Sequence, residues 1–217
     1  MRVSLLLAGG EGRRFGRQDK LLATIGGAPV LLHALRAARL AGRRTLLVLP
    51  PGFAPRRAVI ARARWPGLTV LVARDARRGI GASLARGIAA LRPIDREVAI
   101  FLADMPFARA PLRWAIGADR DAVRPVYRGR PGHPVLVRAA ILRGLAIAPD
   151  AGLAALLDRR RAAGIAGSPG HALDIDTPRA LRRLRHRIAT RAGAFHLGNK
   201  ERRCSKLPHN GSRPPRR

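Results

Sequence analysis

The residues with the clearest potential for chemistry lie in one glycine-rich, cationic stretch near the start of the chain. Residues 5–20 read LLLAGGEGRRFGRQDK. The apolar start indicates a strand buried on both faces. The glycines that follow allow backbone amides to turn toward an anion, because glycine lacks a Cβ and tolerates positive φ. Around these amides stand four cations, Arg13, Arg14, Arg17 and Lys20. The stretch therefore predicts a loop that binds a chain of phosphates.

Two common phosphate-binding loops do not match this stretch. A Walker A loop needs a lysine and a hydroxyl residue directly after its last glycine, whereas Arg17 and Gln18 follow Gly16. A dinucleotide-binding loop needs a third glycine and an acid at the end of the next strand. Here Phe15 stands in the place of the third glycine, and the next predicted strand, residues 44–49, ends before two prolines. Both interpretations are therefore disfavoured.

A second glycine-containing loop precedes a predicted helix at residues 82–91. It contains Gly79 and Gly81, and Ser83 follows in the first helical turn. Free amides and the helix dipole favour anions at such a position. The same residues would also serve as an ordinary helix cap, so both interpretations stand at this point.

One acidic residue, Asp104, is a candidate metal ligand. Asp104 follows a predicted strand at residues 98–102. Ligands of open α/β sheets bind beyond the carboxyl ends of the strands, so Asp104 would lie beside the first loop if both strands are central and parallel. A carboxylate together with substrate phosphates is the usual ligand set of Mg²⁺. Asp104 is one of thirteen acids in a very basic chain, which makes it the best magnesium ligand on offer. Taken alone, an aspartate after a strand is more often a turn former.

Residues 7–20 follow the pattern L-A-G-G-x-x-x-R-x-G-x-x-x-K. This pattern resembles the N-terminal signature of the MobA/MocA-like nucleotidyltransferases, which join a nucleoside monophosphate to molybdopterin. The resemblance continues in the family's order through about residue 187. The later segments that carry it are GIGASL at 79–84, LADMP at 102–106, YRGRPGHPVL at 127–136 and DIDTP at 174–178.

The resemblance implies roles for the residues of these segments. The backbone of the first loop would meet the nucleotide and its phosphates. Arg14 and Lys20 would stabilise the leaving pyrophosphate, and Asp104 would hold Mg²⁺. The implied nucleotide- and acceptor-binding residues are Leu7, Ala8, Gly9, Gly10, Gly79, Gly81, Ser83 and His133.

Two of the later segments allow a second interpretation. His133 is either a residue of the pterin acceptor site or a plain loop histidine. Asp174 or Asp176 would complete the magnesium shell, whereas Thr177-Pro178 beside them is also a normal helix start, with threonine as N-cap and proline at the first helical position. A third segment departs from the family, because residues 149–154, PDAGLA, lack the first glycine and the arginine of its G-D-x-G-x-R pattern.

The implied reaction is nucleotidyl transfer from an NTP to the terminal phosphate of molybdopterin, with release of pyrophosphate. The segments GIGASL, GHPVL and DIDTP are similar to the cytidylyl branch, and Gly9-Gly10 with Asp19-Lys20 to the guanylyl branch, so CTP is favoured and GTP remains an alternative. Related folds activate sugar phosphates and methylerythritol phosphate. The G-x-G-T-R and P-K patterns of the sugar-nucleotide enzymes are absent here. A molybdoenzyme or its chaperone would be the protein partner.

The order of predicted elements indicates the fold class. Strands and helices alternate through the first half of the chain, which predicts a three-layer α/β/α, Rossmann-like, mostly parallel sheet of the nucleotide-diphospho-sugar transferase type. Glycine and proline between the last two predicted strands indicate a β-hairpin excursion. Strands are predicted at residues 3–7, 44–49, 68–72, 98–102, 122–127 and 134–137, and helices at 29–41, 58–64, 82–91, 139–145 and 152–163. We expect one nucleotidyltransferase domain at residues 1–188 and a basic, disordered tail at residues 189–217.

Composition limits the remaining classes of function. The formal charge is +30, and 40 of the 43 basic residues are arginine. A bias toward arginine explains this more simply than nucleic-acid binding, since aromatic residues that could stack on bases make up only 4%. A non-catalytic nucleotide- or nucleic-acid-binding protein is the alternative of another class. Cys204 is the single cysteine, which excludes an intramolecular disulfide. The short apolar start does not fit a signal peptide, and no stretch approaches the ~20 apolar residues of a membrane span, so a cytoplasmic protein is expected.

Overall fold

The chain divides into two units, residues 1–178 and residues 179–217, in the computed structural model. The structure describes residues 1–10, 12, 15–16, 18–111, 114–152, 162–186 and 188. In the second unit, the described residues 179–186 and 188 are helical. The tail predicted at residues 189–217 lies outside the described residues.

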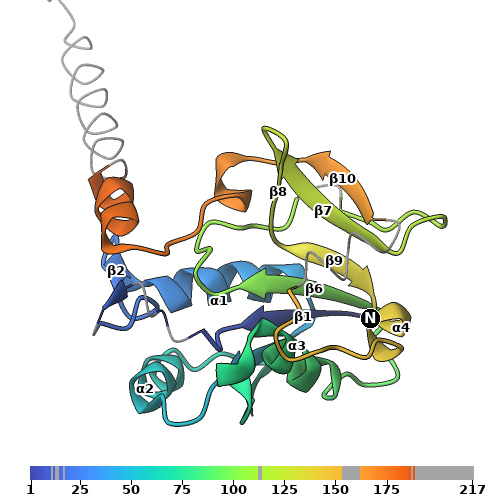
Figure 1. The fold of residues 1–217 in the computed structure, drawn as a ribbon, viewed down its shortest axis with the longest axis horizontal. Coiled ribbons are helices and arrows are strands. Elements are labelled where there is room, and N and C mark those ends of the chain that lie inside the picture. The colour runs from blue at the N-terminus through green and yellow to red at the C-terminus, as the bar shows by residue number, and fades with distance from the viewer. Residues whose placement is uncertain are drawn as a thin grey trace, which may run out of the picture. The chain divides into compact units, whose positions relative to one another are not determined.

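A mixed β-sheet lies at the centre of the first unit (Figure 1). Its parallel core has the spatial order β5 (Leu68–Val72), β4 (Arg44–Leu49), β1 (Arg2–Leu7) and β6 (Glu97–Leu102). Beyond β6 follow β9 (Val135–Arg138), β7 (Ala122–Tyr127) and β10 (Ala162–Ala166), with β8 (Arg130–Pro131) paired to β7. The pairs that β9 forms with β6 and β7 are antiparallel, as is the pair of β7 with β8. A separate small hairpin joins β2 (Thr24–Ile25) to β3 (Ala28–Pro29).

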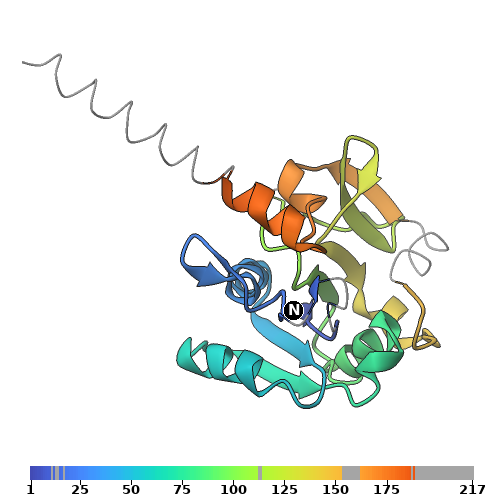
Figure 2. The ribbon, with the colours of Figure 1, turned by 60° about the vertical axis from the view of Figure 1, so that its left-hand side comes forward.

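Helices cover both faces of the parallel core (Figure 1, Figure 2). Side chains alternate between the faces of a strand, and neighbouring residues of β1 show which helix lies on which face. Ser4 Oγ donates a 2.6 Å hydrogen bond to the carbonyl oxygen of Ala38 in α1 (Val30–Ala41). Leu5 instead faces α3 (Ile80–Ile88), where Gly87 comes so close that an added Cβ would lie 2.4 Å from the leucine side chain. The expected three-layer α/β/α arrangement with a parallel core is therefore confirmed.

The other helices that the structure describes in the first unit are short. They are α2 (Ala54–Arg62) after β4, α4 (Ala139–Arg143) after β9, and the 3₁₀ turns η2 (Ala76–Arg78) and η3 (Pro169–His171). The core on the α3 side of the sheet is built from alternate strand residues, chiefly Val3, Leu5, Leu7, Leu46, Val48, Val98 and Ile100. Within the described residues, no helix has the length and apolar character that crossing a membrane would need.

The ends of the predicted elements show where local sequence was insufficient. Strands β4, β5 and β7 have the predicted bounds. The helix predicted to end at Ala163 is wrong at its end, because Ala162–Ala166 forms β10 and pairs in parallel with β7. This Ala- and Gly-rich segment has low intrinsic strand propensity, so pairing with β7 overrides local preference. Residues 153–161 of that predicted helix lie outside the described residues. Helix α2 begins at Ala54, earlier than predicted, with Pro55 in its first turn.

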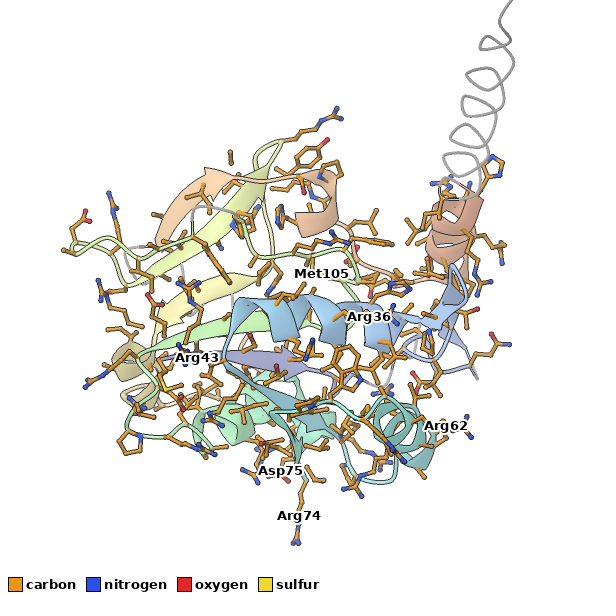
Figure 3. The ribbon with its side chains drawn as sticks, turned by 180° about the vertical axis from the view of Figure 1, so that it is seen from behind. Arg36, Arg43, Arg62, Arg74, Asp75 and Met105 are labelled. Carbon is orange, nitrogen blue, oxygen red and sulfur yellow. The ribbon has the colours of Figure 1, made fainter. Side chains whose placement is uncertain are left out.

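Many arginines of the first unit extend from its surface. Arg36, Arg43, Arg62 and Arg74 are exposed and belong to different parts of the surface, and Arg74 extends plainly away from the molecule (Figure 3). This distribution is what solvated basic faces would give.

One ion pair is buried at the opposite end of the sheet from the carboxyl ends of the parallel strands. Arg44, the first residue of β4, pairs with Asp95, which is 2% exposed and also accepts the Arg92 amide hydrogen bond at 2.8 Å. Burial alone would raise the pKa of Asp95, but Arg44 and the Arg92 amide outweigh it and hold that pKa below its usual value. The pair therefore stabilises the fold above the unfolded-state pKa of about 3.9, and its contribution is lost as pH falls through the folded-state pKa.

We predict that Asp95→Asn lowers the free energy of unfolding by about 2 kcal/mol at pH 7, the size typical of hydrogen bonds to charged groups. Urea unfolding of both proteins at pH 7 and pH 3 should show a smaller difference in the free energy of unfolding at pH 3, because the carboxylate of the unfolded wild type, with a pKa of about 3.9, then takes up a proton. Asp119→Asn, in the exposed pair with Arg120, is the control and should change little. An equal gap at both pH values would mean that packing, not charge, stabilises this position.

Candidate active site

The loops that follow β1 and β6 lie side by side. These strands are parallel neighbours with Leu7 opposite Leu102. Ala103 N donates to Leu7 O at 3.0 Å and joins the two strand ends, while Ala8 N donates to Val48 O of β4, the other neighbour of β1, at 2.9 Å. The glycine loop and Asp104 therefore leave the same edge of the sheet together, which confirms the juxtaposition expected from the order of the strands.

A cavity of about 330 Å³ opens at this edge. Its lining brings together residues from the first loop, from the start of α3 and from the loop after β6. The lining residues are Leu7, Ala8, Gly9, Gly10, Lys20, Leu21, Ala76, Arg77, Gly79, Ile80, Ser83, Leu102, Ala103 and Asp104. The predicted residues Gly81 and His133 are not among them.

Gly9 and Ser83 meet closely at the wall of this cavity. A Cβ on Gly9 would lie 2.2 Å from Ser83 Oγ, so the close approach requires a glycine. Ser83 is 2% exposed, and among the described residues its hydroxyl has no hydrogen-bond partner. A buried hydroxyl without a partner costs free energy. Because the hydroxyl lies on the cavity wall, it is available to form a hydrogen bond with a bound ligand.

Gly79 and Gly81 pack against the segment that departs from the family pattern. Added Cβ atoms would lie 2.5 Å from Pro149 O at Gly79 and 2.1 Å from Ala148 O at Gly81. Pro149 O also accepts a 3.1 Å hydrogen bond from the Ala82 amide. One first-turn amide of α3 is therefore occupied by the protein itself, and both glycines allow this close packing.

Lys20 lies between two carboxylates. Its Nζ donates to Asp104 Oδ2 at 2.7 Å and to Asp176 Oδ1 at 3.0 Å. Burial lowers the pKa of Lys20, but the charges and hydrogen bonds of the two carboxylates more than offset this and raise it. The group is therefore a permanent cation at neutral pH.

A backbone hydrogen bond places the second carboxylate, Asp176, beside Lys20. Ile175 N donates to Asp104 O at 3.0 Å, which brings Asp176 to Lys20, whereas Asp174 on the other side of Ile175 is exposed. Among the described residues no group of three or more acidic, histidine or cysteine side chains is arranged to hold a metal. The donor set of Asp104 and Asp176 still fits a hard divalent cation, because Lys20 Nζ already occupies a cation position between their oxygens and Mg²⁺ takes its other ligands from phosphates and water.

His133 does not line the cavity. Its Nδ1 lies 3.4 Å from Ile100 O, and its amide donates to His171 O at 2.9 Å. Burial lowers the pKa of His133, and the opposing effects of the Ile100 carbonyl and Asp104 are smaller. The imidazole is therefore neutral at pH 7. Its predicted role at the acceptor remains a prediction.

The sequence interpretation missed one organising residue of the site. Arg56 in α2 is fully buried and donates hydrogen bonds to Asp19, to Ala8 O and to Gly10 O. No signal in the sequence pointed to it, because the predicted helix began at residue 58 and Arg56 lies in the first turn only because α2 begins at Ala54. Arg14, predicted to act on the pyrophosphate, lies outside the described residues.

Comparison with known proteins identifies similar folds. Rv0371c from Mycobacterium tuberculosis H37Rv is 25% identical, with a TM-score of 0.67 over 85% of this chain and 97% of that chain; it has also been solved in complex with manganese. The molybdopterin-guanine dinucleotide biosynthesis protein A of Archaeoglobus fulgidus is 16% identical, with a TM-score of 0.58 over 88% and 100% of the two chains. The 4-diphosphocytidyl-2C-methyl-D-erythritol synthase of Anaerococcus prevotii is 14% identical, with a TM-score of 0.63 over 87% and 98%.

No curated protein matched the chain. A family model, however, matches residues 4–164, which include the glycine loop, Ser83 and Asp104. This match spans well over half of the sequence and agrees with the fold of the solved structures. The chain belongs to the family of the MobA-like NTP transferase domain.

Proposed function

We propose that the protein transfers a nucleoside monophosphate from an NTP to the terminal phosphate of molybdopterin. The family supports an NTP as donor. The observation that carries the proposal is the meeting of the glycine loop, the unpartnered Ser83 hydroxyl and the Lys20–Asp104–Asp176 cluster at one cavity. Such a site offers backbone amides and an ammonium to phosphates, and carboxylates to a metal.

The proposed step is a displacement at phosphorus. An oxygen of the acceptor phosphate attacks the α-phosphorus of the NTP and forms a new P–O bond, while the bond to the bridging α,β oxygen breaks and pyrophosphate leaves with its electron pair. The acceptor phosphate is already ionised, so the step needs no side-chain nucleophile. The protein's task is to align two polyanions and to neutralise their charge.

Each residue of the site receives a role in this proposal. The backbone of Gly9 and Gly10 contacts the nucleotide phosphates, and the Ser83 hydroxyl forms a hydrogen bond with the nucleotide. Lys20 turns from the carboxylates to the leaving pyrophosphate, where Arg14 would assist. Asp104 and Asp176 would hold Mg²⁺, which polarises the α-phosphate when bound; the manganese complex of Rv0371c supports a divalent metal. Asp174 would complete the shell if its exposed segment turns inward.

The nucleotide and the acceptor are the finer parts of the proposal. CTP is favoured over GTP because the segments around Ser83, His133 and Asp176 resemble the cytidylyl branch. A different phosphorylated acceptor is the second candidate, since the neighbours in fold include a 4-diphosphocytidyl-2C-methyl-D-erythritol synthase as well as a molybdopterin-guanine dinucleotide biosynthesis protein.

We predict pyrophosphate release from CTP when Mg²⁺ and molybdopterin are both present. The assay compares CTP, GTP, ATP and UTP, each with and without acceptor, and EDTA should abolish the release. Release from GTP alone would assign the guanylyl branch. Release with methylerythritol phosphate or a sugar phosphate in place of molybdopterin would reassign the acceptor, and no release with any pair would contradict the enzyme proposal.

We predict that Asp104→Asn lowers kcat at least about a hundredfold, because it removes a metal ligand and one partner of Lys20. Circular dichroism and thermal melting should show a folded protein. Asp75→Asn is the matched control, since Asp75 is exposed and does not line the cavity. Full magnesium-dependent turnover in the Asp104 variant would remove Asp104 from the metal site.

We predict that Lys20→Met separates two contacts of the Lys20 ammonium, the observed one with the carboxylates and the proposed one with the nucleotide phosphates. Without the ammonium, Mn²⁺ alone should bind at least as tightly as to wild type, because a competing cation is gone from the carboxylates. Binding of CTP or GTP should weaken by about tenfold, since a charged contact to phosphate is lost. Titration calorimetry measures both, with Arg36→Met on exposed α1 surface as control. Weaker Mn²⁺ binding in the Lys20 variant would show that Lys20 does not occupy the cation position.

A further inference from the structure

The guanidinium of Arg56 is enclosed by the first loop and by its own helix. Nε and Nη2 donate to the two oxygens of Asp19 at 2.6 and 2.9 Å, Nη1 donates to Ala8 O at 2.7 Å, and Nη2 also donates to Gly10 O at 3.1 Å. The ring of Phe53 lies 4.1 Å from the guanidinium carbon. We infer that Arg56 is a positioning residue that fixes the glycine loop in the conformation that binds phosphate.

Burying Arg56 in the first turn of α2 costs free energy unless its hydrogen bonds to the glycine loop offset that cost. A fully buried cation is costly without hydrogen-bonded partners, and a cation in the first turn of a helix opposes the helix dipole. Arg56 stands in the first turn of α2 and is 0% exposed. The Asp19 carboxylate and the two loop carbonyls offset these costs, so the arginine and the loop depend on each other.

The hydrogen bond to the Ala8 carbonyl determines the direction of the Gly9 amide. In a trans peptide the C=O and N–H point in opposite directions. Because the Ala8 carbonyl points to Arg56, the Gly9 N–H in the same peptide points away from it. Gly9 lines the cavity and contacts Ser83 there. Arg56 thus turns the Gly9 amide away from α2 without itself lining the cavity.

Asp19 also restrains the backbone at Lys20. Its Oδ1 accepts the Leu21 amide at 3.0 Å as well as an Arg56 hydrogen bond. The backbone of Lys20 is therefore held on both sides, between Asp19 and Leu21, while its Nζ reaches the two carboxylates. One guanidinium therefore fixes the Gly9 amide and the backbone at Lys20 together. Such preorganisation reduces the ordering cost when a triphosphate binds, a consequence that rests on the proposed function.

The test compares Arg56→Met with Arg44→Met. Both variants remove an arginine from its aspartate partner, fully buried at Arg56 and partly buried at Arg44, but Arg44 pairs with Asp95 at the other end of the sheet and does not line the cavity. Hydrogen exchange of the peptides that cover residues 7–21 is measured without nucleotide, at a temperature where both variants are folded. We expect faster exchange of these peptides in Arg56→Met and wild-type exchange in Arg44→Met, even if both lower the Tm.

A second measurement tests whether the conformation of the glycine loop affects nucleotide affinity. CTP and GTP should bind about tenfold more weakly to Arg56→Met and within about twofold of wild type to Arg44→Met. If Arg56→Met does not fold, Asp19→Asn replaces it, because the amide oxygen still accepts the Leu21 hydrogen bond while the charge for Arg56 is gone. Unchanged exchange of residues 7–21 in the folded variant overturns the inference. Absence of nucleotide binding by wild type overturns the proposed function instead, and exchange alone then decides for or against the positioning role.

Discussion

An ammonium group shared by two carboxylates connects the parts of the site. Lys20 follows the glycine loop, Asp104 follows β6, and Asp176 belongs to a segment that reaches the site by hydrogen bonding to Asp104. The carboxylates lie 84 and 156 residues from Lys20 in sequence, so the cluster forms only when the sheet is assembled. Two carboxylates and one ammonium leave an excess of negative charge. That excess is what a divalent cation would neutralise.

This local negative charge contrasts with the protein as a whole. The formal charge of +30 creates a field that draws phosphorylated molecules toward the surface. Such a field acts at long range and does not decide where a phosphate stops or where a metal binds. In the proposed site those positions would depend on short-range contacts with the Gly9 amide, the Ser83 hydroxyl and the paired carboxylates. The basic surface and the proposed metal site would therefore act on different steps of binding.

The sequence was sufficient for the parts of the fold that depend on local pattern. Continuous apolar runs predicted the parallel strands, and their order predicted that Asp104 would meet the first loop. Arg56 could not be predicted in the same way, because 40 arginines look alike in sequence and its partner Asp19 is 37 residues away. Strand β10 was missed because its pairing with β7, and not its Ala- and Gly-rich composition, makes it a strand. Long-range pairing carried the information that local patterns lacked.

Lys20 also differs from every other cation of the folded core. It is the only lysine among residues 1–199, in a chain that otherwise uses arginine. An arginine has a planar fork that matches a single carboxylate in a bidentate pair, as Arg56 does with Asp19. An ammonium is a compact point charge with three donors, so it can lie between two carboxylates of different segments and leave them for a phosphate without breaking a bidentate pair. The two-carboxylate contact of this position therefore favours a lysine over the arginine that the composition prefers, whereas the rigid fork of Arg56 suits a loop that, by our inference, is held in one conformation.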